Sequence, residues 1–359
     1  MSVLDLARAE ILALQAYSSA RREAGDAEVM LNANESPWLP AGASSDTKQR
    51  PLNRYPDPQP ERLLERLAEL YGVNSKQVLI GRGSDEAIDL LVRAFCRPGI
   101  DAIALSPPTF GMYAVCAAVQ GAACIEIPLD AHFAVDVSAL CERLPDSVKI
   151  VFLCTPNNPT GGSTALVDIE RIAYAMRGRA LVIVDEAYIE FSELPSAARL
   201  LESHENLGVL RTLSKAWALA GARIGCLLAG ADIISLLRKI MPPYPLPTPS
   251  VSAALAALTA DGLALTNQRI ALIIAERERM TVALARLPGV IEVLPSTANF
   301  LCVRFVSAGA VYRKLLAGGV IVRDVGRYPG LSDCLRLSIG TREENSQLLD
   351  ILVRNEVSA

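Results

Sequence analysis

The sequence contains only two histidines, His132 and His204, and neither lies in a recognisable motif. A hydrolase built on a Ser-His-Asp triad needs a catalytic histidine, so this pattern argues against that class. The eight cysteines are scattered and form no C-x-x-C pair. We therefore expect reduced, buried thiols, as in a cytoplasmic enzyme, rather than disulfides or a zinc site, and we predict no metal.

Long runs of lysine or arginine are also missing, and the formal net charge at pH 7 is -4. Nucleic acids and anionic membranes attract strongly basic surfaces, so neither is an expected partner. Residues 1–17 carry apolar side chains at helical spacing, with charges between them and no cleavage site after a basic region, which predicts an amphipathic helix rather than a targeting sequence. Later apolar runs are too short or too interrupted to span a bilayer. We expect a soluble protein that binds small molecules.

The chain does have enough apolar material for a large core, with 359 residues of which 51% are hydrophobic. Between residues 78 and 230, short β-branched apolar runs alternate with longer helical patterns. This alternation predicts an α/β fold, with a large domain built on a mostly parallel seven-stranded sheet flanked by helices. The expected strands are 78–80, 102–105, 124–127, 150–154, 181–184, 209–210 and 226–228.

Five prolines among residues 241–249 prevent a regular helix and favour a stiff connector between two parts of the molecule. A smaller α+β domain is expected beyond it. Its elements would be a long helix over 251–287, strands at 291–294, 300–305, 320–323 and 335–339, and a closing helix over about 342–353. The predicted boundaries are 30–250 for the large domain, and 1–29 together with 251–359 for the small domain.

A glycine-containing loop follows the first expected strand and opens a helix. Gly81 and Gly83 let the backbone approach a ligand closely, and Ser84 or Asp85 is suited to cap the helix. The free N–H groups of a helix start suit a phosphate. A dinucleotide-binding loop needs a third glycine where this sequence has Glu86, which disfavours that reading, and a simple strand–helix turn remains the alternative.

Polar side chains follow three further strands. Asn158 lies in Thr-Pro-Asn-Asn-Pro-Thr-Gly, Asp185 ends the run Val-Ile-Val-Asp, and Lys215 ends Thr-Leu-Ser-Lys. Singly, these have ordinary explanations as a turn, a helix cap and a solvated lysine. Because ligands of open α/β sheets bind at the carboxyl ends of the strands, we expect the three to converge on one crevice and to serve a cofactor with several polar groups.

The order and spacing of these motifs resemble the fold-type I aminotransferases of the aspartate aminotransferase superfamily, over nearly the whole chain. The resemblance implies pyridoxal 5'-phosphate as the cofactor. Further motifs are similar to the histidinol-phosphate aminotransferases within that family, which are short as this chain is. They are Leu-Asn-Ala-Asn-Glu-Ser-Pro from residue 31, Arg-Tyr-Pro-Asp-Pro from 54, Gly-Ser-Asp-Glu from 83, Arg-Thr-Leu-Ser-Lys-Ala-Trp from 211 and Leu-Arg-Leu-Ser-Ile-Gly-Thr from 335.

The resemblance implies a role for each residue around the cofactor ring. Lys215 would carry the cofactor as a Schiff base and then shuttle a proton, which requires an amine of lowered pKa. Asp185 would keep the pyridine nitrogen protonated. Tyr188 and Asn158 would hydrogen-bond the phenolic oxygen of the ring. Phe110 would stack on the ring face, where the family more often has a tyrosine.

The resemblance also places the cofactor phosphate at the start of the helix that follows the glycine loop. The residues expected to bind it are Gly83, Ser84, Asp85, Thr212, Ser214 and Arg223. In the family, a tyrosine of the neighbouring subunit reaches the same phosphate, and Tyr55 matches that tyrosine. A homodimer with shared active sites is therefore implied, although packing alone is the alternative for Tyr55.

The implied reaction exchanges an amino group between L-histidinol phosphate and 2-oxoglutarate, in histidine biosynthesis. Arg336 matches the family arginine that binds amino-acid carboxylates, and it would bind the substrate phosphate in the other half-reaction. Arg323 is expected to add donors to the substrate phosphate, together with Tyr17, which the family pattern places near the site from the other subunit, and Asn34 is expected to line the same entrance. A surface salt bridge for Arg323 and helix packing for Tyr17 remain the alternatives.

Two related activities stay open at this stage. An aromatic amino-acid aminotransferase and a threonine-phosphate decarboxylase have related folds and much the same cofactor-binding residues. A cofactor-binding regulator would need a DNA-binding domain, for which the chain has no room.

Overall fold

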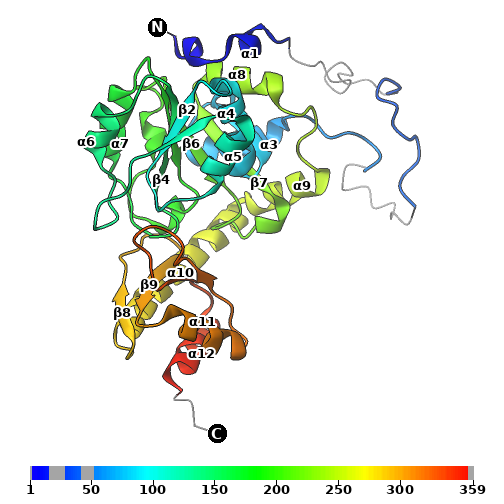
Figure 1. The fold of residues 1–359 in the computed structure, drawn as a ribbon. Coiled ribbons are helices and arrows are strands. Elements are labelled where there is room, and N and C mark those ends of the chain that lie inside the picture. Colours follow the sequence, from blue (N-terminus) through cyan, green and yellow to red (C-terminus); the bar gives the residue numbers. More distant parts are fainter. Residues whose placement is uncertain (1, 16–28, 42–51, 355–359) are drawn as a thin grey trace.

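The computed structural model describes residues 2–15, 29–41 and 52–354, and Figure 1 shows a large α/β unit above a smaller one. The large sheet has the strand order β1-β7-β6-β5-β4-β2-β3. Its strands are β1 (Val78–Arg82), β2 (Ala102–Leu105), β3 (Ala123–Glu126), β4 (Val148–Cys154), β5 (Leu181–Asp185), β6 (Leu207–Thr212) and β7 (Ile224–Ala229). β7 is antiparallel to both of its neighbours, whereas the other pairs are parallel. The predicted mostly parallel, seven-stranded sheet is confirmed.

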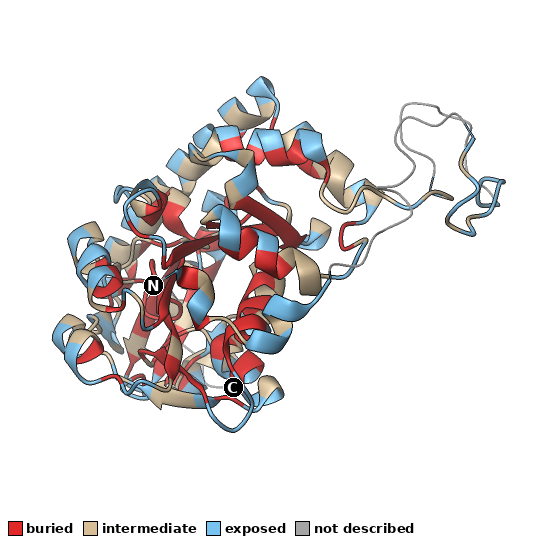
Figure 2. Cartoon of the chain, turned by 90° about the horizontal axis from the view of Figure 1, so that it is seen from above, coloured by how far each residue is buried: buried red, intermediate tan, exposed pale blue. Residues whose placement is uncertain are grey.

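Helices cover both faces of this sheet. Because β5 is buried on both faces, its sequence is apolar at every position up to Asp185. Val182 and Val184 point into the apolar cluster on one face, while Leu181 and Ile183 point into the cluster on the other. The first face is covered by α3 (Glu61–Tyr71), α6 (Val137–Glu142), α7 (Leu166–Ala175) and α9 (Thr248–Ala257), and the second by α4 (Ser84–Phe95), α5 (Met112–Gln120) and α8 (Ala231–Ile240). Figure 2 shows the buried residues concentrated in the sheet and on the helix faces that contact it.

Short 3-10 helices occupy several of the connections. They are η1 (Val3–Leu6), η2 (Ser75–Gln77), η3 (Ile189–Phe191), η4 (Ala197–Leu200) and η5 (Ala220–Ala222). Of these, η3 and η5 follow the strands that carry the expected site residues.

The described N-terminal residues differ from the expectation of one amphipathic helix belonging to the small domain. They form η1 and a separate short helix, α1 (Ala9–Ala13). Val3 and Leu6 are buried in the apolar cluster of α4 and α8, and the Arg8 side chain donates to the carbonyl of Arg93 at 3.0 Å. The spacing of three residues between Val3 and Leu6 suits a 3-10 turn, which presents both side chains to the same surface. This part of residues 1–29 therefore packs on the large domain.

The proline-rich segment also differs from its expected role as a connector between domains. It joins α8 to α9, and both helices lie on the large domain, where Leu246 and Ala254 are fully buried. The helix expected over 251–287 is divided into α9 and α10 (Ala260–Ala285), which meet at an angle of 75°. Thr259 begins α10 by accepting a hydrogen bond from the Gly262 N–H at 3.2 Å. Among the described residues, no single helix is long and apolar enough to span a membrane. The pair α9 and α10 meets that length and hydropathy only when the two helices are counted together across the bend.

The small domain has a four-stranded antiparallel sheet in the order β10-β11-β9-β8. Its elements are β8 (Val290–Val293), β9 (Phe300–Phe305), α11 (Ala308–Ala317), β10 (Arg323–Asp324), β11 (Cys334–Ser338) and α12 (Arg342–Val353). The closing helix is as predicted. The strand expected over 320–323 is wrong in extent, because the Val320 N–H bonds to the Leu315 carbonyl of α11 at 2.8 Å and only Arg323 and Asp324 pair with β11.

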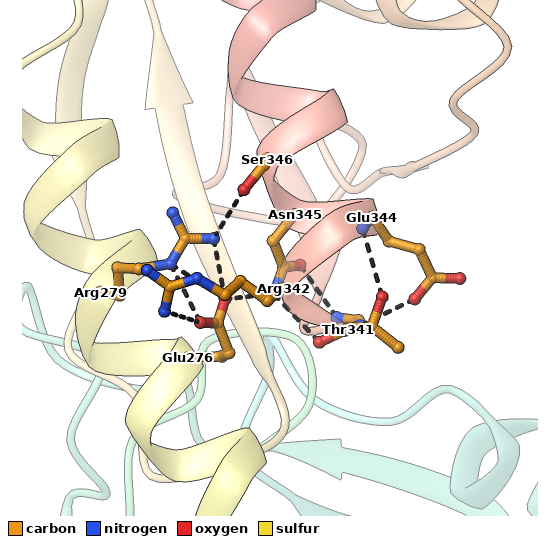
Figure 3. Close-up of polar contacts among 8 residues, drawn as sticks. Glu276, Arg279, Thr341, Arg342, Glu344, Asn345 and Ser346 are labelled. Carbon is orange, nitrogen blue, oxygen red and sulfur yellow. Dashed lines mark hydrogen bonds and ion pairs between the residues drawn. The ribbon is translucent and has the colours of Figure 1, made fainter.

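Polar contacts fix the start of α12 directly after β11 (Figure 3). Thr341 and Glu344 form a reciprocal capping box. The buried amide of Asn345 bonds both backbone groups of Gly340 at 3.0 Å and donates to Glu276 of α10, also at 3.0 Å. The end of β11 is thereby held against α10.

One side chain of α10 links the two domains. The Arg277 guanidinium donates to the Phe191 carbonyl of η3 at 3.0 Å and to the Ala298 carbonyl, just before β9, at 2.9 Å. Residues of α10 also pack against both the large core and the small core, with Ile273 contacting each. The junction between the domains therefore runs through α10.

Candidate active site

One pocket gathers every residue expected around the cofactor except Tyr55. It lies at the carboxyl ends of β4, β5 and β6 and at the start of α4. The expected residues that line it are Gly83, Ser84, Asp85, Phe110, Asn158, Asp185, Tyr188, Thr212, Ser214, Lys215 and Arg223. The pocket adds Cys154, Ala187 and Ala220, which the motifs did not single out.

Two glycines allow the start of α4 to form an anion site. Gly83 has a φ of +82°, and a Cβ there would lie 2.6 Å from the Arg223 guanidinium. A Cβ at Gly225 of β7 would lie 2.4 Å from the Ser84 nitrogen. Gly83 is the N-cap, so the side-chain cap expected from Ser84 or Asp85 is not formed. The N–H groups of the first turn are therefore not satisfied by a capping side chain and suit a phosphate.

The other side of this anion site carries a cation and two hydroxyls. Arg223 donates to Asp85 at 3.2 Å, and the Thr212 hydroxyl donates to the Ser214 hydroxyl at 3.0 Å. A guanidinium, two hydroxyls and a helix start form a donor set that fits a phosphate monoester.

Asp185 ends β5 at the centre of the pocket and is 2% exposed. Burial raises the pKa of Asp185 to about 6, while hydrogen bonds from the Tyr113 hydroxyl at 2.7 Å and the Ala187 N–H at 3.1 Å favour its ionised form. If a cofactor placed a protonated ring nitrogen beside Asp185, its positive charge would stabilise the ionised carboxylate, and the carboxylate would hold the proton on the nitrogen. The sequence motifs did not identify Tyr113, whose only local signal is its helical spacing of three residues from Phe110.

Lys215 follows β6 and lines the same pocket. Loss of hydration lowers the pKa of its amine, and the positive charge of Arg336 lowers it further. The amine lies 5.7 Å from the centroid of the Tyr188 ring. A lysine whose neutral form is favoured is a better nucleophile and proton acceptor.

Arg336 comes from β11 of the small domain and reaches the pocket by donating to the Asn158 side-chain oxygen. The Asn158 amide in turn donates to the Tyr188 hydroxyl at 3.3 Å. Burial raises the pKa of Tyr188, so its hydroxyl is protonated at neutral pH. The small domain thus places a cation beside the polar groups that follow β4 and β5.

Three expected site residues lie away from this pocket, and a fourth lies outside the described residues. Tyr55 is 47% exposed and stacks on Tyr244 with ring centroids 4.3 Å apart. Asn34 is exposed in segment 29–41, which runs outside the body of the molecule (Figure 1). Arg323 is exposed on β10, in register with Arg336 of β11. Tyr17 falls within the undescribed residues 16–28.

The donor set fits pyridoxal 5'-phosphate at each of its functional groups. The phosphate suits the start of α4, the ring nitrogen suits the buried carboxylate of Asp185, and the aldehyde suits the amine of Lys215. Within the described ranges, no group of three or more His, Cys, Asp or Glu side chains is arranged to hold a metal. Fold and pocket together define a pyridoxal-phosphate-dependent enzyme.

Comparison with known families identifies this enzyme class more closely. The model of the aminotransferase class I and II family matches residues 25–352, and the chain belongs to that family. It is an aminotransferase, and its cofactor is pyridoxal 5'-phosphate. A relative named histidinol-phosphate aminotransferase, from Stenotrophomonas maltophilia (strain R551-3), is 53% identical over 362 residues, which cover 99% of this chain and 98% of the relative.

Solved structures agree on the fold. The histidinol-phosphate aminotransferase of Sinorhizobium meliloti in complex with pyridoxal-5'-phosphate is similar with a TM-score of 0.76 and 26% identity, over 84% of this chain and 82% of that one. The L-threonine-O-3-phosphate decarboxylase of Porphyromonas gingivalis has a TM-score of 0.72 and 21% identity, over 84% and 90% of the two chains. The fold is therefore shared with the decarboxylase, and sequence identity favours the aminotransferase.

Proposed function

We propose that this aminotransferase exchanges an amino group between L-histidinol phosphate and 2-oxoglutarate, giving imidazole acetol phosphate and glutamate, in histidine biosynthesis. The observation that carries the choice of substrate is the 53% identity, over the full length, with a relative named for that activity. The pocket supports it, because Arg336 of the small domain contacts Asn158, which lines the same pocket as the lysine and the carboxylate that the reaction needs.

When bound, the cofactor supplies an electron sink that stabilises negative charge on the substrate carbon that bears the amino group. Lys215 would hold the cofactor covalently and would accept and return the proton of that carbon when its amine is free. Asp185 would keep the proton on the ring nitrogen. Asn158 and Tyr188 would bind the phenolic oxygen of the ring, and Phe110 would cover one ring face.

The phosphate of the cofactor would be bound at the start of α4. The backbone N–H groups of Ser84 and Asp85 would donate to it, and Gly83 would allow the close approach. Arg223 would contribute the positive charge, and the hydroxyls of Thr212 and Ser214 would complete the site.

The two substrates share one anion-binding arginine in this proposal. Arg336 binds the carboxylate of glutamate in one half-reaction and the phosphate of histidinol phosphate in the other. Arg323 is aligned with it on the neighbouring strand β10 and adds a second cation for the larger anion. Tyr17 and Asn34 are proposed to complete this end of the substrate site.

An amino-donor screen with 2-oxoglutarate as acceptor tests the proposal. Histidinol phosphate, phenylalanine and threonine phosphate are the donors, and glutamate formation is the readout. The proposal requires the highest kcat/KM with histidinol phosphate. A preference for phenylalanine, or release of carbon dioxide from threonine phosphate, would move the assignment to one of the two alternatives.

We further propose that the enzyme is a homodimer with shared active sites. Segment 29–41 runs outside the body of the molecule (Figure 2) and leaves Leu31 88% and Trp38 77% exposed. Beside Arg223, a hollow of the surface has an apolar wall that includes the exposed side chains of Val115 and Val119. A second copy of the chain would cover both surfaces and bring its Tyr55 to the phosphate.

Mixing two impaired variants tests this sharing. Lys215→Ala has no reactive amine but an intact Tyr55, whereas Tyr55→Ala has the reverse. If Tyr55 acts across the dimer, a hybrid of the two variants contains one complete site and regains activity after the subunits exchange. Mixtures that stay at the sum of the separate activities would show that Tyr55 acts within its own chain.

A cytoplasmic location is also proposed. All eight cysteines are free thiols, which suits a reducing compartment.

A further inference from the structure

We propose that Tyr113 is a positioning residue for Asp185, and that its hydroxyl helps to keep the proton on the ring nitrogen of the cofactor. The inference rests on the proposed place of that nitrogen beside Asp185. Tyr113 does not line the pocket, so it acts through the carboxylate rather than on substrate or cofactor directly.

Tyr113 is held in a single orientation beneath the pocket. Its side chain is fully buried, and its ring stacks on Phe152 of β4 with centroids 4.6 Å apart and 6° between the planes. The edge of the ring meets Phe110, whose centroid lies 5.6 Å away at 82°. Phe110 is the residue proposed to cover the cofactor ring, so this residue just before α5 and Tyr113 in its first turn would support the ring face and the carboxylate together.

The hydroxyl of Tyr113 donates to the Asp185 carboxylate at 2.7 Å. Burial raises the pKa of Tyr113, so the hydroxyl is protonated throughout the physiological range and acts as the donor. The bond ties one carboxylate oxygen, Oδ2, while the Ala187 N–H binds the other, Oδ1, at 3.1 Å. Two donors on opposite oxygens fix the plane of the carboxylate.

Other titratable groups also face this carboxylate from the elements packed against it. They are Cys154 of β4, Lys215 after β6 and Asp85 of α4. The negative charge of Asp85 favours the protonated form of Asp185, whereas Lys215 favours the ionised form. Among these groups Tyr113 is the neutral donor in direct contact, and it stabilises the ionised form at every pH at which the holoenzyme works.

The direction of the effect follows from the donor's position. Removing the hydroxyl makes the Asp185 carboxylate more basic, because its ionised form loses a hydrogen bond. A more basic carboxylate competes better for the proton that it shares with the ring nitrogen. The unprotonated ring withdraws electrons less well, so turnover falls although the substrate still binds.

The test compares Tyr113→Phe with the unmodified protein. For Tyr113→Phe we expect the affinity of the cofactor-free protein for pyridoxal phosphate to fall by about 5-fold at neutral pH, because loss of a hydrogen bond that favours the ionised form leaves more of Asp185 protonated and unable to pair with a protonated ring nitrogen. In holoenzyme made with cofactor labelled with nitrogen-15 in the ring, the nitrogen NMR signal should move towards that of unprotonated pyridine. The kcat value should fall with little change in KM for glutamate. A folded variant with the original affinity and the original nitrogen signal overturns the inference.

Phe152→Leu is the matched control, because it disturbs the stacking partner of Tyr113 and leaves the hydroxyl in place. Its Tm should fall while the nitrogen signal stays unchanged. An equal change of the signal in both variants would assign the effect to packing and overturn the proposal.

A double-mutant cycle tests independently whether Tyr113 acts through Asp185. If Tyr113 acts through the carboxylate, adding Tyr113→Phe to Asp185→Asn should cost little further cofactor affinity. The same loss in both backgrounds contradicts the proposal. Turnover of histidinol phosphate by the unmodified protein is measured alongside, so an error in the proposed substrate appears there and leaves the cofactor readouts unaffected.

Discussion

Replacing Asp185 by Asn should stabilise the cofactor-free protein at neutral pH while it impairs the holoenzyme. Burial raises the pKa of Asp185 from its ordinary value of 3.8 to about 6. Since one pKa unit corresponds to about 1.4 kcal/mol, the ionised carboxylate destabilises the folded, cofactor-free protein by about 3 kcal/mol above pH 7. Asparagine has nearly the same shape and carries no charge. The variant should therefore gain up to that amount.

The pH dependence provides the check. A carboxyl group whose pKa is raised by folding contributes its stability fully below the unfolded pKa of 3.8 and loses it as the pH rises through about 6. In urea unfolding of the cofactor-free proteins, the free energy of unfolding of Asp185→Asn should thus exceed that of the unmodified chain by about 3 kcal/mol at pH 8 and by about 1 kcal/mol at pH 4.5. Equal stabilities at pH 8 would refute the argument. With cofactor bound, the variant should show severely reduced turnover, because a neutral amide does not hold the ring nitrogen protonated.

Three further changes have defined outcomes. Lys215→Ala should fold normally and lose turnover by several orders of magnitude. Borohydride reduction of the unmodified holoenzyme should attach the cofactor to Lys215. A peptide map that places the cofactor on another lysine would contradict the assignment. Arg323→Ala should lower kcat/KM for histidinol phosphate about 10-fold more than for glutamate, whereas equal losses would limit Arg323 to a structural role. Arg211→Ala should reduce the free energy of unfolding by about 3–5 kcal/mol, because Glu186 at 3.2 Å and Glu190 at 2.8 Å would keep buried negative charges without their cation, and a melting curve like that of the unmodified protein would argue against this.

The fold was largely predictable where local sequence and tertiary structure agree. Most strands of the large sheet are short apolar runs between turn residues, and in the central strands β4 and β5 burial on both faces makes the run continuous. The break before α10 was missed because apolar periodicity continues through it, although Thr259 is a good N-cap residue. Residues 320–322 are β-branched and apolar, yet they connect α11 to β10 without pairing, which depends on the position of β11 rather than on their own sequence.

The cofactor pocket was predictable because its residues follow strands whose carboxyl ends meet at one edge. Tyr113 was not, since it lies 72 residues from Asp185 along the chain, and no motif distinguishes it among the nine tyrosines. Tyr55 and Asn34 matched family motifs, but neither approaches the pocket of its own chain. The proposed role of Tyr55 needs a second subunit, and no pattern within one chain contains that geometry.

The course of α10 gives the molecule a mechanical property. At 1.5 Å per residue, its 26 residues form a rod about 39 Å long. Arg277 bonds this helix to the Phe191 carbonyl, three residues after Tyr188. The contact lies about two thirds of the way along α10. A tilt of 5° about that point displaces Ala260 by about 2 Å and Ala285 by about 1 Å in the opposite direction. A change in the tilt of α10 would therefore carry the small domain, and with it Arg336, relative to the pocket of the large domain.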